Sequence, residues 1–283
     1  MIFDARPCDL GEGPLWHPTR GQLFWFDILN KRLMTRTDAG PEHWQFDAMV
    51  SAAGWTGPDS LLIASESRLF SLDLVTGAQA NVVLLESEMP LTRSNDGRAD
   101  RQGGFWIGTM GKRGDDDPGK GAIYRWYRGE LRLLYPGITI PNAICFAPDG
   151  RTAHFADTVT GKVMRVALDS DGWPKGTPEV FLDLTAEGLH PDGAVIDAAG
   201  TMWLAQWGSA RVAAYALDGT FLRAVGFDAP HTSCPAIGTD GTLYCTTALQ
   251  GMDASARAAH PNAGKTFAAP AIAQGIPEPQ VIL

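Results

Sequence analysis

Four short polar motifs occupy the same position in successive repeats of the chain, and this shared phase strongly constrains the fold. The motifs are Gly11-Glu12-Gly13-Pro14, Arg93-Ser94-Asn95-Asp96-Gly97, Pro141-Asn142-Ala143 and Pro191-Asp192-Gly193. Each leads to a turn and then to a strand rich in Trp and Phe, and the turn glycines are Gly21, Gly103, Gly150 and Gly200. The polar residue lies about eight or nine positions before its turn glycine every time, which is too regular for unrelated loops.

Two further segments, residues 55–60 and 237–241, extend the repeat. Turn positions at residues 21, 59, 103, 150, 200 and 241 give a period of about 38 to 50 residues, in the range of propeller blades. Many short apolar runs, with 32 Gly and 19 Pro, argue against a helical solenoid of similar period. The pattern predicts an all-β chain in which six blades of about four strands form a six-bladed β-propeller, a single domain over residues 1–283. We expect residues 265–268 to pair near the N-terminal strand and close the ring, and residues 253–259 to form a short helical turn.

Equivalent repeat positions form one ring, because the start of each innermost strand of a propeller opens onto the central channel. The predicted ring is polar throughout and consists of Glu12, Ser51, Asn95, Asn142, Asp192 and Ser233. Carboxylates and amides are hard oxygen ligands that suit Ca²⁺, Mg²⁺ or Mn²⁺, and Zn²⁺ and Fe²⁺ also accept them. Asn, Asp and Ser commonly cap turns, which would account for any one of these residues alone. Four in phase instead favour a central-channel metal site.

Composition excludes several classes of partner. Hydrophobic residues make up 45% of the chain and charged residues 19%, as in a compact soluble protein, and the net charge of −9 opposes binding to nucleic acid or to an anionic membrane. The four cysteines show no metal-binding or disulfide spacing and are expected to be buried thiols. No signal peptide or bilayer-spanning apolar run is apparent, so a cytoplasmic monomer or weak homo-oligomer is expected.

The motifs together resemble the senescence marker protein (regucalcin), gluconolactonase and luciferin-regenerating enzyme family of six-bladed propellers. The resemblance covers nearly the whole chain and depends on residues 10–16, Asn95-Asp96-Gly97, Gly108-Thr109-Met110, Pro191-Asp192-Gly193, Gly251-Met252-Asp253 and residues 263–267. It implies a divalent ion held by Glu12, Asn142 and Asp192, with Arg93 and Asn95 reaching the substrate. It also implies hydrolysis of sugar-acid lactones, since known members largely carry out that reaction.

Metal-assisted ring opening is the mechanism that these residues favour. A cation would polarise the lactone carbonyl and stabilise the developing oxyanion. The attacking water would lose its proton either to Asp192 or to the ion as bound hydroxide, and the sequence leaves both open. Arg93 would hold sugar hydroxyls or the carbonyl through its planar fork of donors, or would otherwise form a surface ion pair.

The loop after Gly108-Thr109-Met110 departs from the family pattern, because Gly111-Lys112-Arg113 stands where some relatives carry acidic residues that grip substrate hydroxyls. A basic loop over the channel would favour a lactone that carries a carboxylate or phosphate. The alternative is a solvated loop that pairs with the acidic residues 115–117.

Other signals have weaker implications. Residues 114–121 imitate a phosphate-binding loop but lack the required Ser or Thr, and residues 169–172 form a turn and lack the spacing of a calcium loop. His190 and His231 are candidates for the channel mouth, and Trp207 belongs either to the blade core or to the pocket wall. Two other functions stay open, namely hydrolysis of another ester or phosphotriester at the same site and a non-catalytic calcium-binding propeller.

Overall fold

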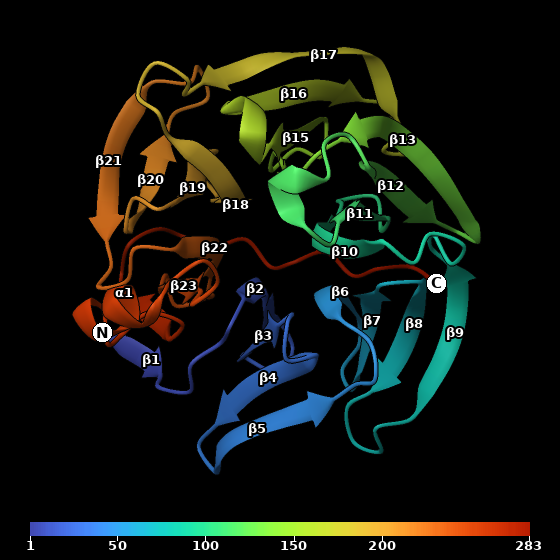
Figure 1. Cartoon of the computed structure of the whole chain (residues 1–283). Coiled ribbons are helices and arrows are strands. Elements are labelled where there is room, and N and C mark those ends of the chain that lie inside the picture. The colour runs from blue at the N-terminus through green and yellow to red at the C-terminus, as the bar shows by residue number, and fades with distance from the viewer.

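The structure is a computed structural model that describes all 283 residues, and it consists of six four-stranded antiparallel sheets arranged in a ring (Figure 1). In each of the first three blades the strands follow chain order from the inner to the outer edge. The first blade contains β2 (Gly11–His17), β3 (Gln22–Asp27), β4 (Arg32–Thr37) and β5 (Gly40–Gln45). The second contains β6 (Val50–Gly57), β7 (Ser60–Ser65), β8 (Arg68–Asp73) and β9 (Gln79–Leu84). The third contains β10 (Thr92–Ala99), β11 (Phe105–Gly111), β12 (Gly121–Tyr127) and β13 (Glu130–Ile138).

The remaining blades complete and close the ring. The fourth contains β14 (Pro141–Phe146), β15 (Thr152–Asp157), β16 (Lys162–Leu168) and β17 (Pro174–Asp183). The fifth contains β18 (His190–Ile196), β19 (Met202–Trp207), β20 (Arg211–Tyr215) and β21 (Phe221–Gly226). The sixth contains β22 (Thr232–Ile237), β23 (Leu243–Thr247), β24 (Thr266–Ala269) and, as its outermost strand, β1 (Ile2–Asp4). The predicted six-bladed propeller and its closure by the two ends of the chain are therefore confirmed.

Helices are few and short. The α-helix α1 (Ala254–Ala259) begins where the Asp253 carboxylate accepts a hydrogen bond from the Ala256 backbone amide, as an N-cap side chain does. It matches the helical turn expected near residue 253. Two 3₁₀ turns, η1 (Gly114–Asp116) and η2 (Thr158–Thr160), lie in connections, and no helix is long and apolar enough to cross a membrane.

The same irregularity occurs near the start of all six inner strands. The pairing of each inner strand with its neighbour shifts register at or just after the ring position, between Glu12/Leu15, Val50/Ala52, Ser94/Gly97, Asn142/Cys145, Pro191/Ala194 and Thr232/Pro235. A β-bulge of this kind bends a strand and re-aims one side chain. Gly13 and Ala143 follow their ring residues, and both have φ near +53°. Glycine adopts this left-handed conformation readily, whereas alanine adopts it rarely. The repeated polar motif is thus the sequence of a bulge that turns a polar side chain toward the channel.

The blades are held together by apolar layers between neighbouring sheets. The inner and second strands are mostly buried, and Trp25, Trp106 and Trp203, one in each of three second strands, are 0–2% exposed. All four cysteines are free thiols inside these layers, as predicted. Second strands with packed neighbours on both faces favour large apolar side chains, which accounts for the Trp- and Phe-rich runs that follow the turns.

The C-terminal residues 270–283 leave the sixth blade and cross the centre of the ring (Figure 1). Along this path the backbone bonds to the ends of inner strands or to the turns that follow them, at Gly241, Ala198, Trp55 and Gly103. These contacts lie at the opposite ends of the inner strands from the polar ring positions, so the segment covers the far end of the channel.

Candidate active site

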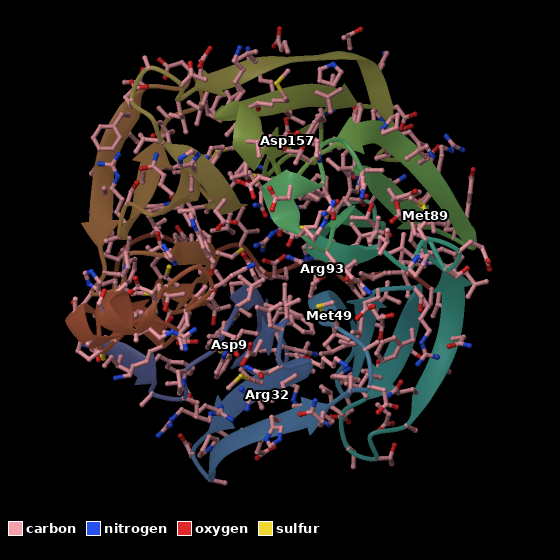
Figure 2. All side chains as sticks on the ribbon, viewed as in Figure 1. Asp9, Arg32, Met49, Met89, Arg93 and Asp157 are labelled. Atoms are coloured by element: carbon pink, nitrogen blue, oxygen red, sulfur yellow. The ribbon has the colours of Figure 1, made fainter.

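The structure brings all five predicted site residues to one large cavity at the start of the inner strands. The cavity has a volume of about 830 Å³, and its lining includes Glu12, Arg93, Asn95, Asn142 and Asp192. These five side chains come from β2, β10, β14 and β18 and are only 3–5% exposed. Arg93 lies near the centre of the ring in Figure 2. The predicted convergence of residues far apart in the chain is thus present, whereas the chemical role of each stays a prediction.

The carboxyl groups of Glu12 and Asp192 form a buried pair. They lie within hydrogen-bonding reach of each other, although they come from residues 180 positions apart. Burial, and then the neighbouring negative charge, raise the pKa of both carboxyl groups. The backbone amide of Gly13 donates to Glu12 Oε2 at 3.1 Å, which offsets only part of the desolvation. Ionising both carboxyl groups is therefore costly unless a cation binds beside them, and otherwise one of them keeps its proton.

A third buried carboxyl group, that of Asp96, lies close enough to raise the pKa of both members of the pair. Its Oδ2 accepts a hydrogen bond of 2.7 Å from the Ile144 backbone amide, which ties β10 to the next inner strand β14. Burial raises the pKa of Asp96 itself to about 6. The buried charge of Arg98 opposes this rise at Asp96. Arg93 is the buried cation that lines the cavity itself, and burial lowers its pKa to about 10.

A chain of side-chain hydrogen bonds orients the amides of the site. Arg93 Nη1 donates to Asn95 Oδ1 at 2.8 Å, and Asn95 Nδ2 donates to Asn142 Oδ1 at 3.1 Å. Asn142 Nδ2 then donates to Thr158 Oγ1 at 2.8 Å, and this hydroxyl donates to the Pro191 carbonyl oxygen at 2.8 Å. The chain runs through three inner strands and ends beside Asp192, so it fixes which atom of each amide faces the cavity.

The donor set fits a divalent cation that prefers oxygen. Glu12 and Asp192 supply two carboxylates, whose charges together match that of a divalent ion, and Asn142 Oδ1 keeps a second lone pair. No group of three or more His, Cys, Asp and Glu side chains forms a metal-binding cluster in the structure, so the amide oxygen is needed to complete three protein ligands. Carboxylate and amide oxygens of this kind favour hard cations.

Aromatic rings line another part of the cavity. Trp207 and His231 stack with ring centroids 4.3 Å apart and an interplanar angle of 13°, and both line the cavity together with His190. The proposed place of the two histidines at the channel mouth is therefore correct. Trp207, for which the sequence left two interpretations, contributes to the pocket lining and also packs on the core of the first two blades.

Both cations of the basic loop take part in ion pairs. Arg113 Nη2 lies 2.6 Å from Asp117 Oδ1, and Lys112 Nζ lies 2.5 Å from Glu66 Oε2. The Arg113 pair agrees with the interpretation that the loop pairs with the acidic residues 115–117. The partner of Lys112 comes from the second blade and was not predicted. Asp117 also pairs with Lys120 Nζ at 2.7 Å, whereas Asp115, which lines the cavity, has no ion pair. The rim therefore presents more free negative than positive charge.

Sequence reasoning missed two residues that shape the site, Asp96 and Thr158. Asp96 belongs to the motif of residues 93–97, but nothing in the local sequence distinguishes a buried carboxyl group from a turn cap. Thr158 lies in η2, outside the repeat motif, and reaches Asn142 across 16 positions. For Asp96 the usable signal is its place directly after a ring position on a bulged strand, because Asp96 there reaches the adjacent blade.

Residues 10–249 match the protein family described as the SMP-30/Gluconolactonase/LRE-like region. The chain belongs to this family. The L-arabinolactonase of Azospirillum brasilense is 34% identical over 275 residues, which is 95% of this chain and 90% of that protein. The 6-deoxy-6-sulfogluconolactonase of Pseudomonas putida is 29% identical over 279 residues, 97% of this chain and 95% of that protein.

A solved structure resembles the whole fold. The calcium-binding protein regucalcin of Agrobacterium tumefaciens is 39% identical, with a TM-score of 0.96 over 100% of this chain and 97% of that one. The predicted family and the six-bladed architecture are thus both confirmed.

Proposed function

We propose that this protein is a sugar lactone lactonase that opens aldonolactones to aldonic acids with the help of one divalent metal ion. The main support is the arrangement at the base of the cavity, where two buried carboxyl groups meet beside an amide oxygen and an arginine. Relatives named L-arabinolactonase and 6-deoxy-6-sulfogluconolactonase support lactones as the substrate class.

Glu12, Asn142 and Asp192 are assigned as the metal ligands. The candidate ions are Ca²⁺, Zn²⁺, Mn²⁺, Mg²⁺ and Fe²⁺. When bound, a divalent cation supplies Lewis acidity toward the lactone carbonyl. The amide chain through Asn95 and Thr158 keeps Asn142 Oδ1 directed to the cavity.

Arg93 and Asn95 are assigned to substrate binding. Arg93 uses Nη1 for its bonds to Asn95 Oδ1 and to the Ser94 carbonyl, so Nε and Nη2 have no protein partner. These donors suit the lactone carbonyl or sugar hydroxyls. Both hydrogens of Asn95 Nδ2 are engaged, by the Pro141 carbonyl and by Asn142. Asn95 therefore offers the substrate only the second lone pair of Oδ1, which accepts from a sugar hydroxyl.

Asp192 is assigned as the proton acceptor. The oxygen of a water molecule bonds to the lactone carbonyl carbon, and Asp192 takes the proton that this water loses. The donors of Arg93 stabilise the oxyanion that forms. The ring C–O bond then breaks, the leaving ring oxygen takes a proton back from Asp192, and the product is a hydroxy acid.

The charges at the rim favour a neutral lactone. Lys112 and Arg113 are already paired with acidic side chains, while Asp115 exposes an unpaired carboxylate to the cavity. A substrate carboxylate or sulfonate would therefore meet repulsion at the rim and find no free cation there. Neutral aldonolactones are the expected substrates.

The experiment measures acid release with a pH indicator from a set of neutral aldonolactones and one anionic lactone. Protein stripped with EDTA is compared with the same protein after each divalent ion is added back. We expect metal-dependent release that is fastest with a neutral lactone. Asp192→Asn removes the activity, whereas the control Asp183→Asn, at an exposed outer-strand carboxylate, retains it.

The alternatives are distinguished in the same preparation. Failure of every lactone to release acid above the spontaneous rate, while calorimetry detects bound cation, would contradict the proposal and favour a calcium-binding propeller. Metal-dependent hydrolysis of an aryl ester or phosphotriester without lactone turnover would favour a different hydrolase.

A further inference from the structure

The inner strand β10 carries both proposed substrate-binding residues, yet it is a sheet edge. It pairs through its backbone only with β11, and its other edge faces the channel. An edge strand has backbone ladder bonds on one side alone, so side-chain anchors contribute strongly to its position. At the cavity end these anchors are Arg93 and Asn95 themselves, together with the bond from the Ile144 amide to Asp96.

The other end of β10 is anchored by the C-terminal segment. Arg98 forms an ion pair with the Glu278 carboxylate, and the two side chains are only 9% and 11% exposed. The backbone oxygen of the same Glu278 accepts a hydrogen bond of 2.7 Å from Trp55 Nε1, on the neighbouring inner strand β6. One residue of the C-terminal segment thus joins two adjacent inner strands at the far end of the channel.

The segment around Glu278 is itself held firmly on both sides. Backbone amides of Val281 and Ile282 donate to the carbonyls of Trp55 and Gly103, each at 2.9 Å. On the other side of the channel, the Gln274 carbonyl accepts from the Ala198 amide at 2.9 Å. Residues 270–283 therefore form a strap tied to blades on both sides of the axis, and they carry Glu278 as a fixed point.

We propose that this strap is part of the active-site scaffold and that Glu278, acting through Arg98, positions the strand that presents Arg93 and Asn95 to the substrate. The inference depends on the proposed lactonase function for its kinetic test, but its structural test is independent. Glu278 is a positioning residue, since it lies at the far end of the channel and cannot touch the substrate.

The test is Glu278→Gln, which keeps the size of the side chain and removes its charge. The matched control is Glu179→Gln, which removes the carboxylate of an exposed ion pair with Arg165 at 2.7 Å on the outer strands of the fourth blade. We expect amide hydrogen exchange in β10 to become about tenfold faster in Glu278→Gln and to stay unchanged in the control. At a temperature where both are folded, kcat/KM for the lactone should fall about tenfold in Glu278→Gln alone, mostly through a higher KM.

Other outcomes overturn the proposal. Faster exchange confined to residues 270–283, or an unchanged kcat/KM in folded Glu278→Gln, would mean that the strap only stabilises the fold. If Glu278→Gln does not fold, Glu278→Asp takes its place, with the same pattern at two- to threefold size expected and wild-type values overturning the proposal. If wild-type protein opens no lactone, the proposed function fails, and exchange in β10 alone decides the role of the strap.

Discussion

Replacing Asp96 by Asn is expected to stabilise the metal-free protein at neutral pH. Burial raises the pKa of this carboxyl group from 3.8 to about 6 in the folded state. A folded-state pKa above the unfolded one means that the folded protein holds the proton more tightly, so stability is complete below pH 3.8 and is lost as the pH rises through 6. The difference of pKa corresponds to about 3 kcal/mol at 1.36 kcal/mol per pKa unit. The side-chain amide introduced by Asp96→Asn needs a new acceptor, which costs about 1–2 kcal/mol, so a net gain of about 1–2 kcal/mol is expected at pH 8.

The assay is urea unfolding in EDTA, followed by Trp fluorescence, at pH 4.5, 6 and 8. The informative quantity is the loss of unfolding free energy between pH 4.5 and 8, which should be smaller in Asp96→Asn by at least about 2 kcal/mol. In the wild type, the Asp96 charge also raises the pKa of Glu12 and Asp192. Removing this charge lowers those two pKa values, so these groups also destabilise the folded state less as the pH rises. Divalent cation affinity should fall in this variant because one negative charge near the site is gone. Parallel pH profiles for wild type and variant would refute the reasoning.

Three further outcomes are expected. The variants Glu12→Gln, Asn142→Ala and Asp192→Asn each remove one proposed ligand. Each should weaken metal binding, measured by calorimetry, at least tenfold and abolish most lactone hydrolysis. Wild-type rates in two of the variants would refute the assignment. The double variant Lys112→Ala/Arg113→Ala should leave the ratio of neutral to anionic lactone turnover unchanged, because both charges are already paired; a tenfold change in that ratio would show that the loop selects charge. Arg125→Met should lower the unfolding free energy by about 3–5 kcal/mol in urea titrations, since it strands the Asp100 carboxylate of a fully buried ion pair; a loss under 1 kcal/mol would contradict this.

The fold was predictable because its information is local and repeated. Each turn and the apolar strand after it appear within about ten residues, and six copies in phase indicate blades. The convergence of Glu12, Asn142 and Asp192 followed from the ring alone, since equivalent positions of a closed propeller must meet. The β-bulges were not predicted, although they are the reason that these side chains turn inward.

The contacts between blades were not predictable from the repeat. Lys112 pairs with Glu66 of the preceding blade, and Arg98 pairs with Glu278 across 180 positions. A single sequence contains no pattern that links such partners, because each pair depends on how neighbouring sheets pack. For the same reason Asp96 could not be distinguished from a solvated turn residue until its burial was known.

Because every inner strand begins with a β-bulge, each blade contributes its polar side chain independently of the others. Ser51 and Ser233 occupy the equivalent places in the second and sixth blades, and their hydroxyls are used for bonds to Ser94 and to the Gly11 carbonyl. Neither serine lines the cavity, so a substitution at either place would change the side chain at the head of one inner strand while the sheet that carries it keeps its pairing. A toroid of this kind can therefore acquire a new ligand or lose an old one in a single blade, and the other five need not be rebuilt.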